Sequence, residues 1–414
     1  MEYNDFILNT IYGESPIVAG FLQDEMKRQE DNIELIASEN FVSDAVLAAA
    51  GSCFTNKYAE GYPSNRYSGR EGRYYGGTQN VDKLEEYCCD KWREVFKTNY
   101  HVNVQPHSGS QANLAAYMSV LTPGDKILSM ELESGGHLSH GMRANASGKL
   151  YQFTHYNLNK YGYIDMSDFR SKLWSVKPQM VVIGASAYSR KINYSDFYSL
   201  IEDYRKITGN QCYMMVDMAH VAGLIAAGDH PSPFGYADII TTTTHKTLRG
   251  ARGGLIFCKP ELAKKIDGSI FPGNQGGPLE HIIAAKAITA EEACTDKYRE
   301  YIHQVVKNAK AMSDRFIRLG YKVVTGGTDN HMFLLDLSNL NITGLEVQDM
   351  LDEHNITLNK NMIPNDKRTP KETSGVRIGT PAMTTKGYVE EDFIRVADEI
   401  DRLIKEYIKQ KEAN

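Results

Sequence analysis

The stretch Thr241-Thr-Thr-Thr-His-Lys246-Thr-Leu-Arg-Gly-Ala-Arg-Gly-Gly254 joins a predicted buried strand to a candidate reactive lysine. The β-branched run that leads into it, beginning at Ile239, predicts a strand with both faces covered. A lysine just past such a strand is shielded from water. This shielding lowers the pKa of its amine and lets the neutral amine attack a carbonyl. The alternative is a lysine that caps the strand end and reaches solvent.

Similar short apolar runs recur on both sides of this stretch. They cover residues 126–130, 180–183, 213–216, 239–242 and 254–257. Segments of helical character separate the first four, and Ser195 to Thr208 is one example, with apolar residues at helical spacing. This alternation of strands and helices predicts an α/β fold with a mostly parallel sheet flanked by helices.

The character of the chain changes after Gly277. Residues 279–319 predict a long helix, residues 332–337 a strand, and residues 390–411 an amphipathic helix with a period of about 3.6 residues. A chain of 414 residues also exceeds the usual size of a single hydrophobic core. We therefore expect two domains. Residues 1–290 would form an N-terminal arm and a large α/β domain, and residues 291–414 a small C-terminal α+β domain.

Composition restricts the class of function. The net charge of −6 argues against a nucleic acid or an anionic membrane as the main partner. The first twenty residues show no secretory signal pattern, and the most apolar stretch, residues 180–187, is too short to span a bilayer. The six cysteines show neither a CxxC pair nor zinc-type spacing, so we expect reduced thiols, no metal site and a cytoplasmic location.

Two further motifs lie where an α/β sheet binds its ligands. Asp217 ends the predicted strand 213–216, and ligands of open α/β sheets sit beyond the carboxyl ends of the strands. A carboxylate there could pair with a pyridine nitrogen, although it could also be a helix N-cap. Ser108, Gly109 and Ser110 precede an apolar helical run and could offer backbone N–H groups to a phosphate, or simply cap the helix.

A histidine completes the set. His137 follows Gly135 and Gly136 after the strand 126–130, and its imidazole could stack on a flat ring or be purely structural. Each motif is ambiguous alone. Together, a lysine, a strand-end aspartate, a phosphate cup and a stacking histidine form the set that a pyridoxal-phosphate site of fold type I requires, because an acid at the pyridine nitrogen makes the ring an electron sink.

The sequence resembles the serine hydroxymethyltransferase family over nearly its whole length. The family-specific runs are at residues 35–40, 56–63, 105–113, 184–188, 216–224, 241–254, 271–278, 326–331 and 373–381. The resemblance implies an aspartate-aminotransferase-like fold with a mostly parallel seven-stranded sheet. It also implies reversible conversion of L-serine and tetrahydrofolate to glycine and 5,10-methylenetetrahydrofolate.

The resemblance assigns roles by motif. Lys246 forms the Schiff base with pyridoxal 5'-phosphate. The other residues expected in catalysis are Glu60 (the acid–base carboxylate), Tyr58 and His245. The cofactor-binding set is Ser108, Gly109, Ser110, His137, Ser186, Asp217, His220, Arg252 and Gly277. The substrate set is Arg377, which would clamp the carboxylate, with Ser38 and Tyr75, and the residues near folate are Leu132, Leu138, Phe271 and Asn361. Because Tyr58 and Gly277 come from a neighbouring subunit in the family, the resemblance implies a homodimer with shared sites, alone or within a tetramer.

Two departures from the family pattern bear on the acceptor. The loop between Gly61 and Gly77 is about seven residues longer than usual, so Arg66-Tyr67 and Arg73-Tyr74 are rival candidates for the usual Arg-Tyr pair. Glu133 adds a negative charge near the expected site. The rival activity is a folate-independent threonine or β-hydroxy-amino-acid aldolase or transaldolase on the same scaffold. A catalytically dead scaffold subunit is disfavoured because the cofactor residues occur together.

Overall fold

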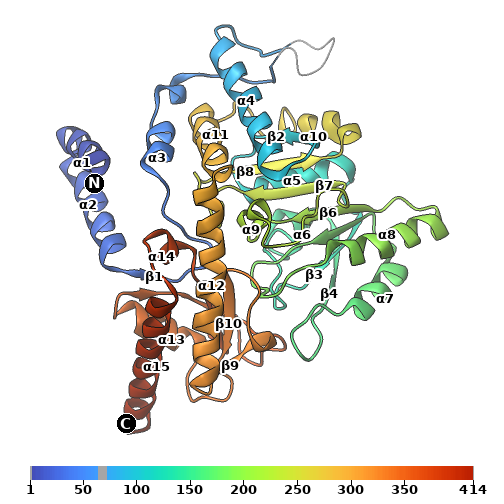
Figure 1. Ribbon diagram of the computed structural model, residues 1–414. Helices are drawn as coiled ribbons and strands as arrows, with labels where there is room; N and C mark the ends of the chain where they lie inside the picture. Colours follow the sequence, from blue (N-terminus) through green and yellow to red (C-terminus); the bar gives the residue numbers. More distant parts are fainter. Residues whose placement is uncertain (1, 64–71, 414) are drawn as a thin grey trace.

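The computed structural model describes residues 2–63 and 72–413, and its centre is a seven-stranded sheet (Figure 1). The strand order is β2-β8-β7-β6-β5-β3-β4, and pairing is parallel from β7 to β4 and antiparallel on both sides of β8. The strands are β2 (His101–Asn103), β3 (Lys126–Met130), β4 (Gln152–Tyr156), β5 (Met180–Ile183), β6 (Tyr213–Asp217), β7 (Ile239–Thr243) and β8 (Gly254–Cys258). The predicted α/β class with a mostly parallel seven-stranded sheet is confirmed.

Helices cover both faces of this sheet. Consecutive strand residues alternate between two cores: Val181 packs with the helices of one face and Val182 with those of the other. This two-sided burial explains why the strands read as continuous apolar runs. One face carries α4 (Gln79–Phe96), α7 (Met166–Val176), α8 (Tyr194–Thr208) and α9 (Ala222–Ala227), and the other carries α5 (Gly109–Val120) and α10 (Ala263–Ile270).

A second core forms around a four-stranded antiparallel sheet of order β12-β13-β10-β9. Its strands are β9 (Lys322–Val323), β10 (Met332–Asp336), β12 (Asn359–Asn361) and β13 (Gly375–Gly379). The helices packed on it are α12 (Asp296–Arg318), α13 (Gly344–Asp352) and α15 (Glu390–Ala413). Leu35 joins this core from the N-terminal region, next to the short parallel pair of β1 (Ile33–Glu34) with β11 (Ile356–Thr357).

The predicted long helix 279–319 is wrong in one respect, because the structure divides it. It consists of α11 (Glu280–Ala293) and α12, and the break falls at Cys294 and Thr295. The Thr295 hydroxyl accepts a hydrogen bond from the backbone N–H of Tyr298 and so caps α12. Helical periodicity continues on both sides of the break, and a single threonine in the sequence did not disclose it.

The remaining elements lie outside the two sheets. Helices α1 (Glu2–Glu14) and α2 (Pro16–Asp31) pack against each other at the edge of the molecule (Figure 1). The other short helices are α3 (Asp44–Ala50), α6 (Ala146–Leu150) and α14 (Pro381–Thr385). Among the described residues, no helix is long and apolar enough to cross a membrane.

Candidate active site

A cavity of about 390 Å³ lies beyond the carboxyl ends of the parallel strands. Such strand ends converge on one edge of the sheet, so residues distant in sequence meet there. The lining residues are Ser38, Glu39, Ser108, Gly109, Ser110, Asn113, His137, His140, Ala185, Ser186, Asp217, Ala219, His220, Thr243, His245, Lys246, Arg252 and Arg377. The structure therefore brings the predicted lysine, aspartate, phosphate cup and histidine into one site.

The phosphate cup is formed by the start of α5. Ser108 is the N-cap, and its hydroxyl accepts from the backbone N–H of Gln111. A Cβ at Gly109 would lie 2.6 Å from Cγ2 of Thr243, so this approach of helix to strand requires glycine. The positive end of the helix faces the cavity beside Arg252. Both readings of this motif therefore apply: it caps the helix and also lines a site suited to an anion.

Asp217 stands at the end of β6 and is held as an anion. Its carboxylate accepts hydrogen bonds from Asn113 Nδ2 (2.8 Å) and from His140 Nε2 (3.0 Å). Burial alone would raise the pKa of Asp217, but the His140 contact and the other nearby donors hold it well below its usual range. The N-cap alternative for Asp217 is wrong, since the cap of the following helix is Val221.

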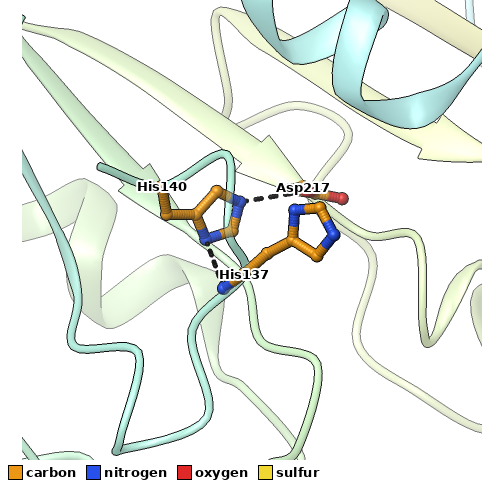
Figure 2. A group of neighbouring side chains, drawn as sticks. All are labelled: His137, His140 and Asp217. Atoms are coloured by element: carbon orange, nitrogen blue, oxygen red, sulfur yellow. Dashed lines mark hydrogen bonds and ion pairs between the residues drawn. The ribbon is translucent and has the colours of Figure 1, made fainter. Parts of the chain in front are cut away.

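His137 lines the same cavity and lies close to His140 and Asp217 (Figure 2). Burial lowers the pKa of His137 to about 4, so its imidazole is uncharged at neutral pH. His137, His140 and Asp217 offer ligand atoms within 4.8 Å of one another, which is close enough to hold a metal ion. In the structure, however, His140 Nε2 is engaged with Asp217 and His140 Nδ1 accepts from the backbone N–H of His137.

Lys246 and Arg377 reach the cavity from the two different sheets. Lys246 follows β7 and is only 9% exposed, so the solvent-reaching alternative is wrong. Burial lowers the pKa of Lys246 to about 8; Asp217 opposes this shift, while Arg377 and Arg252 add to it. Arg377 lies on β13, where its guanidinium donates to the Ser186 carbonyl (2.7 Å) and to Asn359 Oδ1 (3.0 Å).

His220 lines the cavity, and its ring contacts His331, a residue that was not predicted from the sequence. His220 Nδ1 and His331 Nε2 are 3.3 Å apart, and the two buried rings stack with centroids 5.5 Å apart. Burial lowers the pKa of both imidazoles, that of His331 to about 3. His140 and Asn113 were also missed. Their distance in sequence from residues that were predicted is a signal that could have found them. His140 lies three residues after His137, and Asn113 lies one helical turn after Gly109.

Several predicted residues do not line this cavity but form a second group. Tyr58 and Tyr75 pack edge to face with ring centroids 5.0 Å apart, and Tyr58 Oη is 3.4 Å from Glu60 Oε1. A Cβ on Gly277 would lie 3.3 Å from the Tyr58 ring. Tyr58 is 54% exposed, so this group, unlike the cavity, opens to the surface.

None of the four predicted folate residues is among the described residues that line the cavity. Leu132 and Leu138 have exposed side chains, and Asn361 lies on β12. Phe271 packs against Tyr74 with centroids 5.6 Å apart. Glu133 is exposed, as expected if it points to solvent.

The structure describes one of the two rival Arg-Tyr pairs of the long loop. Arg66-Tyr67 lies outside the described residues, whereas Arg73 is 1% exposed and is consumed by hydrogen bonds to Asp82 and Glu85 and to the carbonyls of Ala59 and Gly61. Arg73 therefore points into the protein, and it is not among the residues that line the Lys246 cavity.

The model of the serine hydroxymethyltransferase family matches residues 13–400. The chain belongs to this family. Its members are one-carbon transferases that use pyridoxal phosphate, with tetrahydrofolate as co-substrate, in serine and glycine metabolism. The predicted family, fold type I class, enzyme type and cofactors are thereby confirmed.

The cavity residues fit pyridoxal phosphate. A helix N-terminus faces an anion site, a carboxylate is held ionised where a ring nitrogen needs a partner, and a neutral imidazole is available for stacking. In addition, Thr243 Oγ1 and His245 Nδ1 are buried at the cavity with no hydrogen-bond partner among the described residues. Such orphaned groups are costly unless a ligand satisfies them.

Proposed function

We propose that this serine hydroxymethyltransferase-family chain transfers the hydroxymethyl group of L-serine reversibly to tetrahydrofolate, forming glycine and 5,10-methylenetetrahydrofolate. The observation that carries the proposal is that the Arg377 guanidinium and the Lys246 amine face one cavity together with Asp217. A guanidinium fork matches the carboxylate of an α-amino acid, and the amine provides the point of covalent attachment for the cofactor.

The cavity residues have separable tasks in this proposal. Pyridoxal phosphate supplies, when bound, a ring that withdraws electrons from the substrate α-carbon. Asp217 holds a proton at the pyridine nitrogen, since its own pKa is low. His137 would stack on the ring, Ser186 and His220 would contact the phenolic oxygen, and the α5 N-terminus with Arg252 would hold the phosphate. Arg377 and Ser38 orient the substrate carboxylate.

The second group of residues supports a shared site. Tyr58, Glu60, Tyr75 and Gly277 cluster at the surface instead of lining the Lys246 cavity. In a homodimer, this cluster of one copy would complete the cavity of the other, with Glu60 moving the proton at the serine hydroxyl. Folate would then lie near Leu132, Leu138, Phe271 and Asn361, at the mouth. The exposed apolar side chains of α1 and α2, among them Phe6 and Phe21, offer a further surface suited to contact with a second copy.

A cytoplasmic location belongs to the same proposal. Four of the six cysteines are buried. Burial raises the pKa of Cys212 to about 12, so this thiol is protonated and unreactive at neutral pH. A buried thiol that stays protonated, together with the absence of a CxxC pair in the sequence, suits a reducing compartment.

The experiment that tests the proposed reaction compares acceptors. Purified protein loaded with pyridoxal phosphate is given labelled L-serine with and without tetrahydrofolate, and glycine is quantified. We expect cleavage to accelerate strongly with tetrahydrofolate. Equal rates in both arms would overturn the folate proposal and leave the aldolase reading in its place, with L-threonine cleavage as the second readout.

A further inference from the structure

Arg190 ties the segment after β5 to the start of the second sheet. It lies four residues beyond Ser186, and its side chain is only 17% exposed. Nε donates to Thr325 Oγ1 (3.0 Å), Nη1 to Asp329 Oδ1 (2.8 Å) and Nη2 to the Thr325 carbonyl (2.7 Å). The guanidinium also lies over the Tyr163 ring, 5.8 Å from its centroid. A rigid fork that satisfies three acceptors at once fixes two segments relative to each other.

The backbone beside Arg190 is joined to the same segment. The Ser189 carbonyl accepts from the backbone N–H of Asp329 (2.9 Å) and from Thr328 Oγ1 (3.1 Å). The Tyr188 carbonyl accepts from Asn330 Nδ2 (2.9 Å). Residues 188–190 and 325–330 therefore form a continuous seam between the two sheets.

Local backbone geometry is adapted to this seam. Thr325 has a φ of 65°, a left-handed conformation that is unfavourable for a threonine. In this conformation it presents both its hydroxyl and its carbonyl to Arg190. A Cβ at Gly327 would lie 3.3 Å from Arg190 Nη2, so the glycine leaves room for the guanidinium.

The seam is connected to the substrate arginine at both ends. Segment 325–330 leads directly into β10, and β10 pairs with β13 so that Leu334 lies opposite Arg377. Arg377 in turn donates to the carbonyl of Ser186, in the segment that carries Arg190. The two sheets are thus joined at two places near the site, through the seam and through Arg377. Arg190 supplies the charged contacts of the seam.

We propose that Arg190 is a positioning residue that fixes Arg377 relative to Lys246 and so sets the affinity for the amino-acid carboxylate. The proposal rests on the proposed function, in which Arg377 binds that carboxylate. Without Arg190, the second sheet would sample positions in which Arg377 and Lys246 no longer match one substrate. The apparent affinity falls by the fraction of molecules that remain competent.

The test compares Arg190→Ala and Arg190→Lys with Lys191→Ala, a matched control that removes the neighbouring exposed charge. For the holoenzyme, the glycine dissociation constant is measured calorimetrically, together with KM and kcat for serine. We expect Arg190→Ala to weaken glycine binding and raise KM about tenfold, with kcat changed less than about threefold, as a loss of binding-competent population requires. Arg190→Lys should recover part of the affinity, and Lys191→Ala should match the wild type.

A second readout does not depend on activity. Amide hydrogen exchange at Asp329, whose backbone N–H donates to the Ser189 carbonyl, should accelerate in Arg190→Ala, with or without cofactor, because opening the seam exposes this group. Asp329→Asn removes the ion pair from the opposite side and keeps the test valid if Arg190→Ala folds poorly; it should weaken glycine binding in the same direction. Wild-type-like glycine affinity in both variants would overturn the inference alone. A wild-type protein that binds no glycine would overturn the proposed function, and the inference with it.

Discussion

Two buried lysines show how surroundings decide the role of a residue. Burial lowers the pKa of both Lys246 and Lys286 to about 8. Lys286 Nζ donates to the carbonyls of Val104, Pro106 and Gly254, which holds the amine in place. Lys246 instead lines the cavity, where a carbonyl ligand can reach it. A lowered pKa is thus shared by a structural and a candidate catalytic amine, and the partners distinguish them.

Lys246→Ala should abolish covalent attachment of the cofactor. The amine is the nucleophile for the aldehyde carbon, and the described residues that line the cavity include no other lysine. We expect serine cleavage to fall by at least about 10²-fold, the range typical of losing a group that acts at the reacting atoms. The measurement is the absorbance of the bound cofactor after borohydride treatment and gel filtration, combined with the rate. Retention of covalent cofactor in this variant would mean that another residue carries it.

Lys286→Met should have the opposite profile. It removes the donor shared by three buried carbonyls, so the free energy of unfolding should fall by roughly 2 kcal/mol or more. The folded fraction should still hold the cofactor covalently through Lys246. Urea unfolding and cofactor content measured on the same samples separate the two lysines. An unchanged unfolding midpoint would contradict the structural role of Lys286.

The residues recovered from the sequence are those whose chemistry is local to a motif. Lys246 and Asp217 follow strands that apolar runs predict, so their place at the strand ends could be inferred. The His140 contact with Asp217 and the His331 contact with His220 join segments 77 and 111 residues apart. Such pairs depend on how the sheets assemble, and no periodicity in a single sequence encodes them.

At the scale of elements, strands were predictable and a helix boundary was not. Runs 126–130 and 180–183 match β3 and β5 residue for residue, because strands buried on both faces are mostly apolar. The short β2 was missed, since its three residues include His101 and Asn103. The break between α11 and α12 escaped because Ala, Glu and Thr surround it without glycine or proline.

The start of α11 carries a buried carboxyl that makes stability depend on pH. Burial, followed by repulsion from Glu85, raises the pKa of Glu280 to about 8, and Arg73 Nη2 lies 3.8 Å from Glu280 Oε1. Asp82 and Lys57 are the other charged groups that act on it. Between pH 4.5, the ordinary value, and about 8 the folded state holds the proton that the unfolded state has lost. This group therefore lowers stability as pH rises through that window.

Glu280→Gln should remove this pH dependence. We expect the variant to unfold at a higher temperature than the wild type at pH 8.5, and the difference to shrink toward pH 5, because the amide stays neutral throughout. One proton can contribute at most about 1.4 kcal/mol per pH unit to the slope. Thermal unfolding of both proteins from pH 5 to 9 provides the comparison, with Glu291→Gln, at a partly exposed glutamate of the same helix, as the control. Parallel curves for wild type and Glu280→Gln would contradict the assignment.

For the whole molecule, we propose that the two hydrophobic cores correspond to two domains that divide near residue 290. Both contribute to the cavity: Asp217 ends β6 and Lys246 follows β7 of the large sheet, and Arg377 lies on β13 of the small one. In this arrangement the small domain holds the substrate carboxylate and the large domain holds the cofactor. Contacts such as that of Arg190 with Thr325 then determine how the two domains are positioned relative to each other.

The proposed homodimer predicts complementation between two inactive variants. In a two-fold dimer each site combines the Lys246 cavity of one copy with the Tyr58 and Glu60 cluster of the other. Lys246→Ala and Glu60→Gln should each be nearly inactive alone. In a mixed dimer, one site carries both substitutions and the other site carries neither. Random exchange at equal concentrations makes half of the dimers mixed, so activity should recover to about one quarter of the wild-type value.

The mixing experiment distinguishes a shared site from one completed within each chain. The two variants are co-refolded, or co-expressed with different affinity tags, and the doubly tagged dimer is isolated and assayed. Lys246→Ala mixed with Lys246→Ala carrying the other tag is the matched control and should stay inactive. If Glu60 acted in its own chain, every site of the mixed dimer would lack one of the two residues and no activity would return. Recovery therefore requires that Glu60 crosses the interface, which is consistent with its position outside the Lys246 cavity of its own chain.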